Sequence, residues 1–147
     1  MGILDALQGQ KIYLDTNIFI YAIESYSDYL VALEEVFESA DAGNLVVVTS
    51  ELTLAEVLVK PLQEGDLDKQ QAYCEALQNS ESLIVAGVSR EVLIEAAQIR
   101  ANQKLKLPDA IHLATAIQYQ CSTFLTNDSR FKGNYPLPIV ILSEVIA

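Results

Sequence analysis

The feature that most constrains the fold is a regular alternation of short apolar runs with longer amphipathic segments. Runs rich in β-branched and aromatic side chains lie at 11–14, 45–48, 83–86, 123–126 and 139–142. Apolar residues at helical spacing fill most of the sequence between them, at 18–23, 28–41, 51–61, 66–78, 90–103 and 108–120. Strands that alternate with helices predict an α/β domain with a mainly parallel central sheet, covered by helices on both faces.

Local signals set the expected helix boundaries. Ser50 and Ser89 are suitable N-cap residues, and Pro108 suits the first position of a helix. Pro61 is expected to stop the helix that follows Ser50. In the segment 66–78, the predicted core members are Leu67, Tyr73 and Leu77.

Length and hydropathy predict one cytoplasmic domain spanning residues 1–147. No apolar run approaches the roughly 20 residues that cross a bilayer, so no membrane association is expected. The N-terminus lacks a basic segment followed by an apolar stretch, so no signal peptide is predicted. Cys74 and Cys121 lack metal-ligand spacing and are interpreted as reduced core thiols.

The net charge of −11 argues against a general nucleic-acid binder, because phosphate contacts need Lys and Arg. The basic residues are nevertheless concentrated. Between positions 100 and 132, five bases stand against two acids, and these bases are Arg100, Lys104, Lys106, Arg130 and Lys132. The window predicts a nucleic-acid contact, although a solvated surface would have the same composition.

Four acids stand where a carboxylate is unexpected. Asp15 follows the apolar run 11–14, and Asp128 lies just beyond the run 123–126. Glu56 shares the apolar stripe of its helix with Leu52 and Val59. Asp109 falls in the first turn of the helix that begins near Pro108. Each acid alone could cap a helix, offset its dipole or lie at the edge of a stripe.

Together the four acids predict a metal site. Ligand sites in parallel sheets lie at the carboxyl ends of the strands, so these carboxylates are expected to converge there. Close carboxylates repel each other, and a hard divalent cation such as Mg²⁺ or Mn²⁺ relieves that repulsion through oxygen ligands. The resulting chemistry is activation of water and stabilisation of charge on a phosphoryl oxygen.

Other catalytic sets are missing from the sequence. It has no glycine-rich phosphate loop and no Gly-x-Ser-x-Gly elbow. The single histidine, His112, lies one turn after Asp109 and could touch the site or the substrate. A helix-surface or core position is the simpler interpretation of His112.

Four segments carry these acids in a recognisable order. They are YLDTNIFIY at 13–21, TSELTLAEV at 49–57, LPDAIHLATA at 107–116 and LTNDSRF at 125–131. With these segments the sequence resembles the PIN-domain nucleases, including the VapC-type toxins of bacterial toxin–antitoxin pairs. Order and spacing agree over nearly the whole chain.

The resemblance implies a three-layer α/β/α sandwich and an RNA-cleaving activity that depends on Mg²⁺ or Mn²⁺. The family's metal-binding carboxylates fall on Asp15, Glu56, Asp109 and Asp128. Asn17 and Thr126 fall where the family often has polar residues that support the metal site. An antitoxin partner and a homodimer are further implications.

Two other functions remain open. A non-catalytic PIN module would bind a protein or RNA partner, but such modules usually lose one or more of the acids. A Mg²⁺-dependent phosphatase-like α/β domain also places acids at strand ends, but it typically has paired acids near the first strand. Asp15 has no acidic neighbour.

Overall fold

A computed structural model describes residues 2–146 of the chain. Across these residues one parallel sheet contains five strands: β1 (Lys11–Leu14), β2 (Val46–Ser50), β3 (Leu83–Ala86), β4 (Thr123–Thr126) and β5 (Ile139–Ile141). Their order is β3-β2-β1-β4-β5, and each strand runs parallel to its neighbours. The predicted parallel sheet is therefore confirmed.

Helices follow the strands as the alternation predicts. The longer ones are α2 (Thr16–Ile23), α3 (Leu30–Asp41), α4 (Glu51–Glu64), α5 (Leu67–Ala76), α6 (Arg90–Asn102) and α7 (Leu107–Gln118). Short turns of helix at α1 (Ile3–Ala6), η1 (Ser129–Phe131) and α8 (Leu142–Val145) were not predicted. They are too short for a helical period to show in the sequence.

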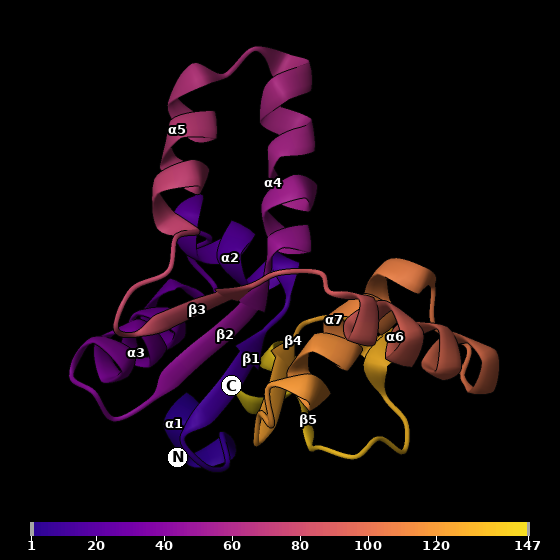
Figure 1. The fold of residues 1–147 in the computed structure, drawn as a ribbon. Coiled ribbons are helices and arrows are strands. Elements are labelled where there is room, and N and C mark those ends of the chain that lie inside the picture. The colour runs from indigo at the N-terminus through magenta and orange to yellow at the C-terminus, as the bar shows by residue number, and fades with distance from the viewer. Residues whose placement is uncertain (1, 147) are drawn as a thin grey trace.

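Alternate residues of the strands face opposite layers. Ile12 and Leu14 of β1 pack into a core with α2, α3, α4 and α5. Tyr13 points the other way and packs with Phe124 of β4 and with α7. Helices therefore cover both faces of the sheet, with α3 on one side and α6 and α7 on the other (Figure 1). This is the predicted three-layer α/β/α fold.

The position of β1 at the centre of the sheet places the site. Its two neighbours are β2 and β4, so the chain reverses its direction of winding at β1. Such a reversal leaves a crevice at the carboxyl ends of the strands. Asp15 follows the end of β1, and Asn127 and Asp128 follow the end of β4.

Several local predictions were wrong. The helix after Ser50 continues through Pro61 to Glu64 and ends at Gly65, which has a positive φ of 66°. Leu67 is exposed rather than a core residue, whereas Tyr73 and Leu77 are buried as predicted. Cys74 is also exposed, and both cysteines are free.

Among residues 2–146, no helix is long and apolar enough to cross a membrane.

Candidate metal centre

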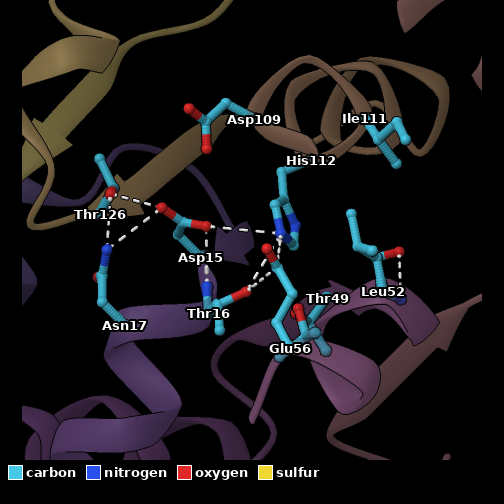
Figure 2. A network of polar contacts seen from close by, with 12 residues as sticks. Asp15, Thr16, Asn17, Thr49, Leu52, Glu56, Asp109, Ile111, His112 and Thr126 are labelled. Atoms are coloured by element: carbon cyan, nitrogen blue, oxygen red, sulfur yellow. Dashed lines mark hydrogen bonds and ion pairs between the residues drawn. The ribbon is translucent and has the colours of Figure 1, made fainter. Parts of the chain in front are cut away.

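Asp15 is the most buried of the four predicted acids, with 5% of its surface exposed. Its carboxylate caps α2, because the backbone N–H of Thr16 donates to Asp15 Oδ1 at 2.8 Å. The Thr126 hydroxyl donates to Oδ2 at 2.7 Å, and the Asn17 side-chain amide donates to the same atom at 3.3 Å. Asn17 and Thr126 thus contact Asp15 directly, as Figure 2 shows.

A second set of bonds fixes this corner between α2 and β4. The Asn17 amide also donates to the Thr126 hydroxyl at 3.4 Å. In return, Asn17 Oδ1 accepts from the backbone N–H of Asn127 at 3.1 Å. Hydrogen bonds from α2 and from the end of β4 therefore fix the orientation of the Asp15 side chain.

Glu56 approaches from α4. Its Oε1 accepts from the Thr16 hydroxyl at 2.7 Å and from His112 Nε2 at 2.6 Å. Partial burial raises the pKa of Glu56, but the hydrogen bonds from His112 and Thr16 outweigh that effect, and the pKa lies below its usual value. Val59, which shares the predicted stripe, is exposed, so the stripe itself is not the buried face of α4.

Asp109 lies in the first turn of α7, and its Oδ2 is buried without a hydrogen-bond partner within residues 2–146. Burial raises the pKa of Asp109. The guanidinium of Arg130 opposes that rise, while the charges of Asp15 and Asp128 add to it. Figure 2 shows the Asp109 side chain on the far side of Asp15 from Glu56.

Asp128 caps the short helix η1 and forms a close ion pair with Arg130. The guanidinium Nη2 lies 2.5 Å from Asp128 Oδ2, and Nε lies 2.9 Å from the same oxygen. Nη2 also approaches Asp109 Oδ2 at 3.5 Å. Hydrogen bonds from Arg130 hold the pKa of Asp128 below its usual value despite partial burial. Arg130 therefore bridges two of the four acids.

His112 of α7 is the site residue whose role the sequence left undecided. It is 1% exposed, and its Nε2 faces Glu56 at 2.6 Å and Asp15 Oδ1 at 3.8 Å. Its Nδ1 lies 2.7 Å from the hydroxyl of Tyr13. His112 lies three residues after Asp109, so both side chains are expected on one side of α7. This spacing is the sequence feature that could have indicated a place for His112 in the site.

The five predicted RNA-binding residues have different surroundings. Arg100 donates to the backbone carbonyl of Leu105 at 2.6 Å, and Lys132 pairs with Glu144. Lys104 and Lys106 are exposed, and Lys106 is the N-cap residue of α7. The charge of Lys106 contributes to the low pKa of Asp128, after the larger effects of Arg130.

The oxygen-only set of carboxylates suits a hard divalent cation. Within residues 2–146, no three His, Cys, Asp or Glu side chains are already arranged closely enough to hold an ion. The buried Oδ2 of Asp109 nevertheless accepts no hydrogen bond within residues 2–146, and the Arg130 guanidinium lies 3.5 Å from it, so a bound cation could supply the missing close contact. The residues present therefore fit Mg²⁺ or Mn²⁺ chemically.

Solved structures of similar fold are toxin–antitoxin proteins. VapBC2 from Rickettsia felis, bound to a promoter DNA fragment, matches with a TM-score of 0.70 and 20% identity over 89% of this chain and 98% of that chain. A toxin–antitoxin complex from Klebsiella pneumoniae matches with a TM-score of 0.66 and 23% identity, over 89% and 97%. VapC20 from Mycobacterium tuberculosis, a toxin that cleaves the sarcin–ricin loop, matches with a TM-score of 0.63 and 17% identity, over 84% and 91%.

Sequence comparison gives the family directly. No curated protein matches the chain at a significant level. The family model of the PIN domain, however, matches residues 12–135, a range that includes all four acids. With the parallel sheet and the acids at its carboxyl edge, this match shows that the chain belongs to the PIN-domain family.

Proposed function

We propose that this protein is a metal-dependent endoribonuclease that cleaves RNA phosphodiester bonds, and that it is the toxin of a toxin–antitoxin pair. The observation that carries the proposal is the buried Oδ2 of Asp109, which lies beside the charges of Asp15 and Asp128, accepts no hydrogen bond within residues 2–146 and pairs with Arg130 at 3.5 Å alone. A carboxylate oxygen in that position costs stability unless a cation closer than the Arg130 guanidinium binds it. A site that is unfavourable when empty is typical of a functional centre.

Asp15, Glu56, Asp109 and Asp128 would hold Mg²⁺ or Mn²⁺. When bound, the cation would supply a Lewis acid for the phosphoryl oxygen and lower the pKa of a coordinated water. The chain's own residues orient these acids. Thr126 and Asn17 fix Asp15, while Thr16 and His112 fix Glu56.

A basic segment beside the acids would bind the RNA backbone. Lys104 and Lys106 lie on the connection into α7, and both are exposed. Arg100, Arg130 and Lys132 extend the segment but already have intramolecular partners. Arg130 would have to release Asp109 or Asp128 before it could contact a phosphate. Lys104 and Lys106 are therefore the stronger candidates for substrate contact.

The decisive experiment incubates the purified protein with a mixed RNA pool and Mn²⁺. Cleavage is expected, with loss in EDTA and in the variants Asp15→Asn and Asp109→Asn. Asp68→Asn is the matched control, because Asp68 is an exposed acid of α5. A small phosphomonoester assayed in parallel tests the phosphatase alternative. RNA that stays intact with Mn²⁺ would contradict the proposal, and RNA binding without cleavage would favour a non-catalytic module.

An antitoxin partner is the second part of the proposal. A groove of about 560 Å³ lies away from the acids and has an apolar lining that includes Phe19, Ile23, Leu33, Phe37, Val47 and Leu83. Glu34, Glu38 and Asp41 add negative charge to it. We propose that a basic, amphipathic segment of the antitoxin fills this groove, because both its shape and charge are complementary to such a segment.

The product of the adjacent open reading frame is the partner to test. Phe37→Glu is expected to abolish complex formation, because it places a charge inside the groove. Val31→Glu on the exposed side of the same helix is the control. Equal binding by both variants would exclude the groove.

The predicted homodimer and the predicted cytoplasmic location remain predictions.

A further inference from the structure

A hollow of about 390 Å³ lies where the turn between α2 and α3 meets α8, and the chemistry of the acids does not use it. Four residues line it. Asp28 and Tyr29 come from the turn, and Ser143 and Ile146 come from α8 and its C-cap. The hollow therefore combines a carboxylate, an aromatic ring, a hydroxyl and an apolar side chain.

Asn127 connects this hollow to the acids. Its Oδ1 accepts from the backbone N–H of Ser143 at 2.8 Å, which fixes the orientation of the side-chain amide. The amide nitrogen donates to the hydroxyl of Tyr29 at 3.2 Å. Asn127 directly precedes Asp128, and its backbone N–H donates to Asn17 at 3.1 Å. One residue therefore separates the lining of the hollow from a proposed metal ligand.

Packing holds the ring of Tyr29 in place. Tyr29 packs against Tyr21 of α2 with ring centroids 4.6 Å apart, and Tyr26 packs against Tyr21 at 4.9 Å. The turn fixes this cluster, because the backbone N–H of Tyr26 donates to the carbonyl of Tyr21 at 2.9 Å. A ring that is already ordered loses little side-chain entropy when a flat ligand stacks on it.

The polar groups of the hollow have hydrogen-bonding capacity that the protein does not use. The Tyr29 hydroxyl accepts from Asn127, but its own proton has no acceptor within residues 2–146. In the same part of the chain, the Ser143 hydroxyl and the exposed Asp28 carboxylate have neither a hydrogen-bond nor an ion-pair partner. The hollow thus offers hydroxyl donors as well as a carboxylate acceptor to a ligand.

This mixture of groups distinguishes between classes of ligand. An arginine or lysine of a protein partner would pair with Asp28, but it carries no acceptor for the hydroxyl protons. An unpaired nucleobase has a face that stacks on an aromatic ring and both donors and acceptors on its edge. Guanine fits best, because its N1–H and N2–H groups are adjacent donors for one carboxylate and its O6, beside them, accepts from a hydroxyl.

We propose that the hollow is a nucleobase subsite, in which one unpaired guanine of an RNA strand stacks on Tyr29 and donates to Asp28. In a duplex the same guanine donors pair with cytosine, so the subsite selects single strands. The link through Asn127 would place the neighbouring phosphates at the acids. That last step rests on the proposed function, whereas guanine binding itself does not require cleavage.

The first test measures RNA binding in EDTA at low salt, by fluorescence anisotropy of short labelled strands of uridine with G, A, C or U at the centre. The wild type is expected to bind the strand with G about tenfold more tightly than the all-U strand. Asp28→Asn should lose this preference, because an amide cannot accept from both guanine donors. Asp68→Asn removes the same charge from an exposed position on α5 and should keep it. Equal binding of the four strands by the wild type, or binding of none, would overturn the proposal.

The second test separates stacking from packing. Tyr29→Phe keeps the aromatic ring and should retain the preference for the strand with G. Tyr29→Leu should bind that strand about tenfold more weakly than Tyr29→Phe, because it removes the stacking face. Thermal unfolding identifies any variant that has lost its fold, in which case Asp28→Asn still decides the matter. Equal affinities of the folded Phe and Leu variants would show that the ring has only a structural role and would overturn the proposal.

The outcomes distinguish this inference from the proposed function. If the preference for guanine depends on Asp28 but the wild type leaves RNA intact with Mn²⁺, the nuclease proposal fails and the subsite stands. If RNA is cleaved with the same base preference by the wild type and Asp28→Asn, the subsite fails and the nuclease proposal stands. Variants of Asp28 and Tyr29 that keep guanine binding but lose the product of the adjacent open reading frame would assign the hollow to that protein instead.

Discussion

Asp109 and Asp128 face the same guanidinium, but the pKa of Asp109 is raised and that of Asp128 is lowered. Arg130 makes close hydrogen bonds to Asp128 and holds its pKa low. It reaches Asp109 Oδ2 only at 3.5 Å, and there burial and the neighbouring acids raise the pKa. One arginine therefore compensates one acid well and leaves the other poorly compensated. This residual imbalance is what a divalent cation would relieve.

The Asp109→Asn variant is expected to be more stable than the wild type in EDTA at neutral pH. The pKa of Asp109 is raised in the folded protein, so its ionised form disfavours folding above that pKa. The difference should vanish as the pH falls below about 4, where the unfolded carboxyl is also protonated. A gain of ~1 kcal/mol would raise the melting temperature by about 2–4 °C.

Thermal unfolding with and without Mn²⁺ completes this measurement. Mn²⁺ should raise the melting temperature of the wild type by mass action and have little effect on Asp109→Asn. Melting temperatures that do not depend on Mn²⁺ in either protein would count against a shared metal centre.

At the residue scale, sequence predicted acids at strand ends but not the contacts between them. Asp15 and Asp128 could be found because a strand's end is a local property of the sequence. The contact of His112 with Tyr13 joins positions far apart in the chain, and its existence depends on the packing of α7 against β1. The bridging position of Arg130 likewise depends on η1, whose three residues show no helical period.

At the scale of elements, the hairpin of α4 and α5 projects from the body of the domain (Figure 1). Two polar contacts with Glu24 tie α5 to the end of α2. The Tyr73 hydroxyl donates to Glu24 Oε2 at 2.5 Å, and Lys69 pairs with Glu24 Oε1 at 3.1 Å. The hydrogen bond from Tyr73 is the main reason that the pKa of Glu24 is lowered.

Tyr73→Phe should destabilise the protein by about 1–2 kcal/mol at neutral pH, because it removes a hydrogen bond to a charged acceptor. The pKa of Glu24 is lowered in the folded state, so the stabilisation is present above its unfolded pKa and is lost as the pH falls through the folded value. Urea unfolding at several pH values measures the effect, with Tyr135→Phe as control. A loss of stability that did not shrink in acid would show that packing, not this hydrogen bond, is responsible.

The segment between α6 and α7 supports a prediction about RNA. Replacing Lys104 and Lys106 with Gln should weaken RNA binding and flatten its salt dependence, by about 0.7 in the log–log slope for each lost phosphate contact. Lys60 and Arg90 are the control pair, because both are exposed and lie on other helices. Lys69 is a poorer control, since it pairs with Glu24. Filter binding over a salt series would reject the prediction if both double variants behaved alike.

Most elements were predictable because their signals are periodic. Strands β1, β3 and β4 have the predicted bounds. Strand β2 covers 46–50 instead of 45–48, and β5 ends at Ile141 instead of Leu142. The extension of α4 beyond Pro61 was not predictable from the local rule, because α4 also packs against α5 and the last turn ends at Gly65. Tertiary packing there outweighs the unfavourable proline.

At the scale of the whole molecule, the net charge of −11 disfavours the compact state through self-repulsion. Adding NaCl in EDTA should therefore raise the melting temperature at neutral pH, because salt screens that repulsion. The increase should be much smaller near pH 4.3, the sequence pI, where the net charge is close to zero. Thermal unfolding followed by circular dichroism over a salt series measures the increase at neutral pH and near pH 4.3. A melting temperature that fell with moderate NaCl at neutral pH would show that attractive ion pairs dominate.

The central position of β1 has a further consequence for how the protein can be divided. The exposed connection 87–89, between β3 and α6, separates a first segment that contains Asp15 and Glu56 from a second that contains Asp109 and Asp128. The pairing of β1 with β4 joins the two segments, at Ile12 with Thr123, Tyr13 with Phe124 and Leu14 with Leu125. A chain cut at this connection would yield two fragments, each with half of the acids and neither with a complete centre. The protein is therefore suited to fragment complementation, in which regained Mn²⁺ binding reports that the two halves have met.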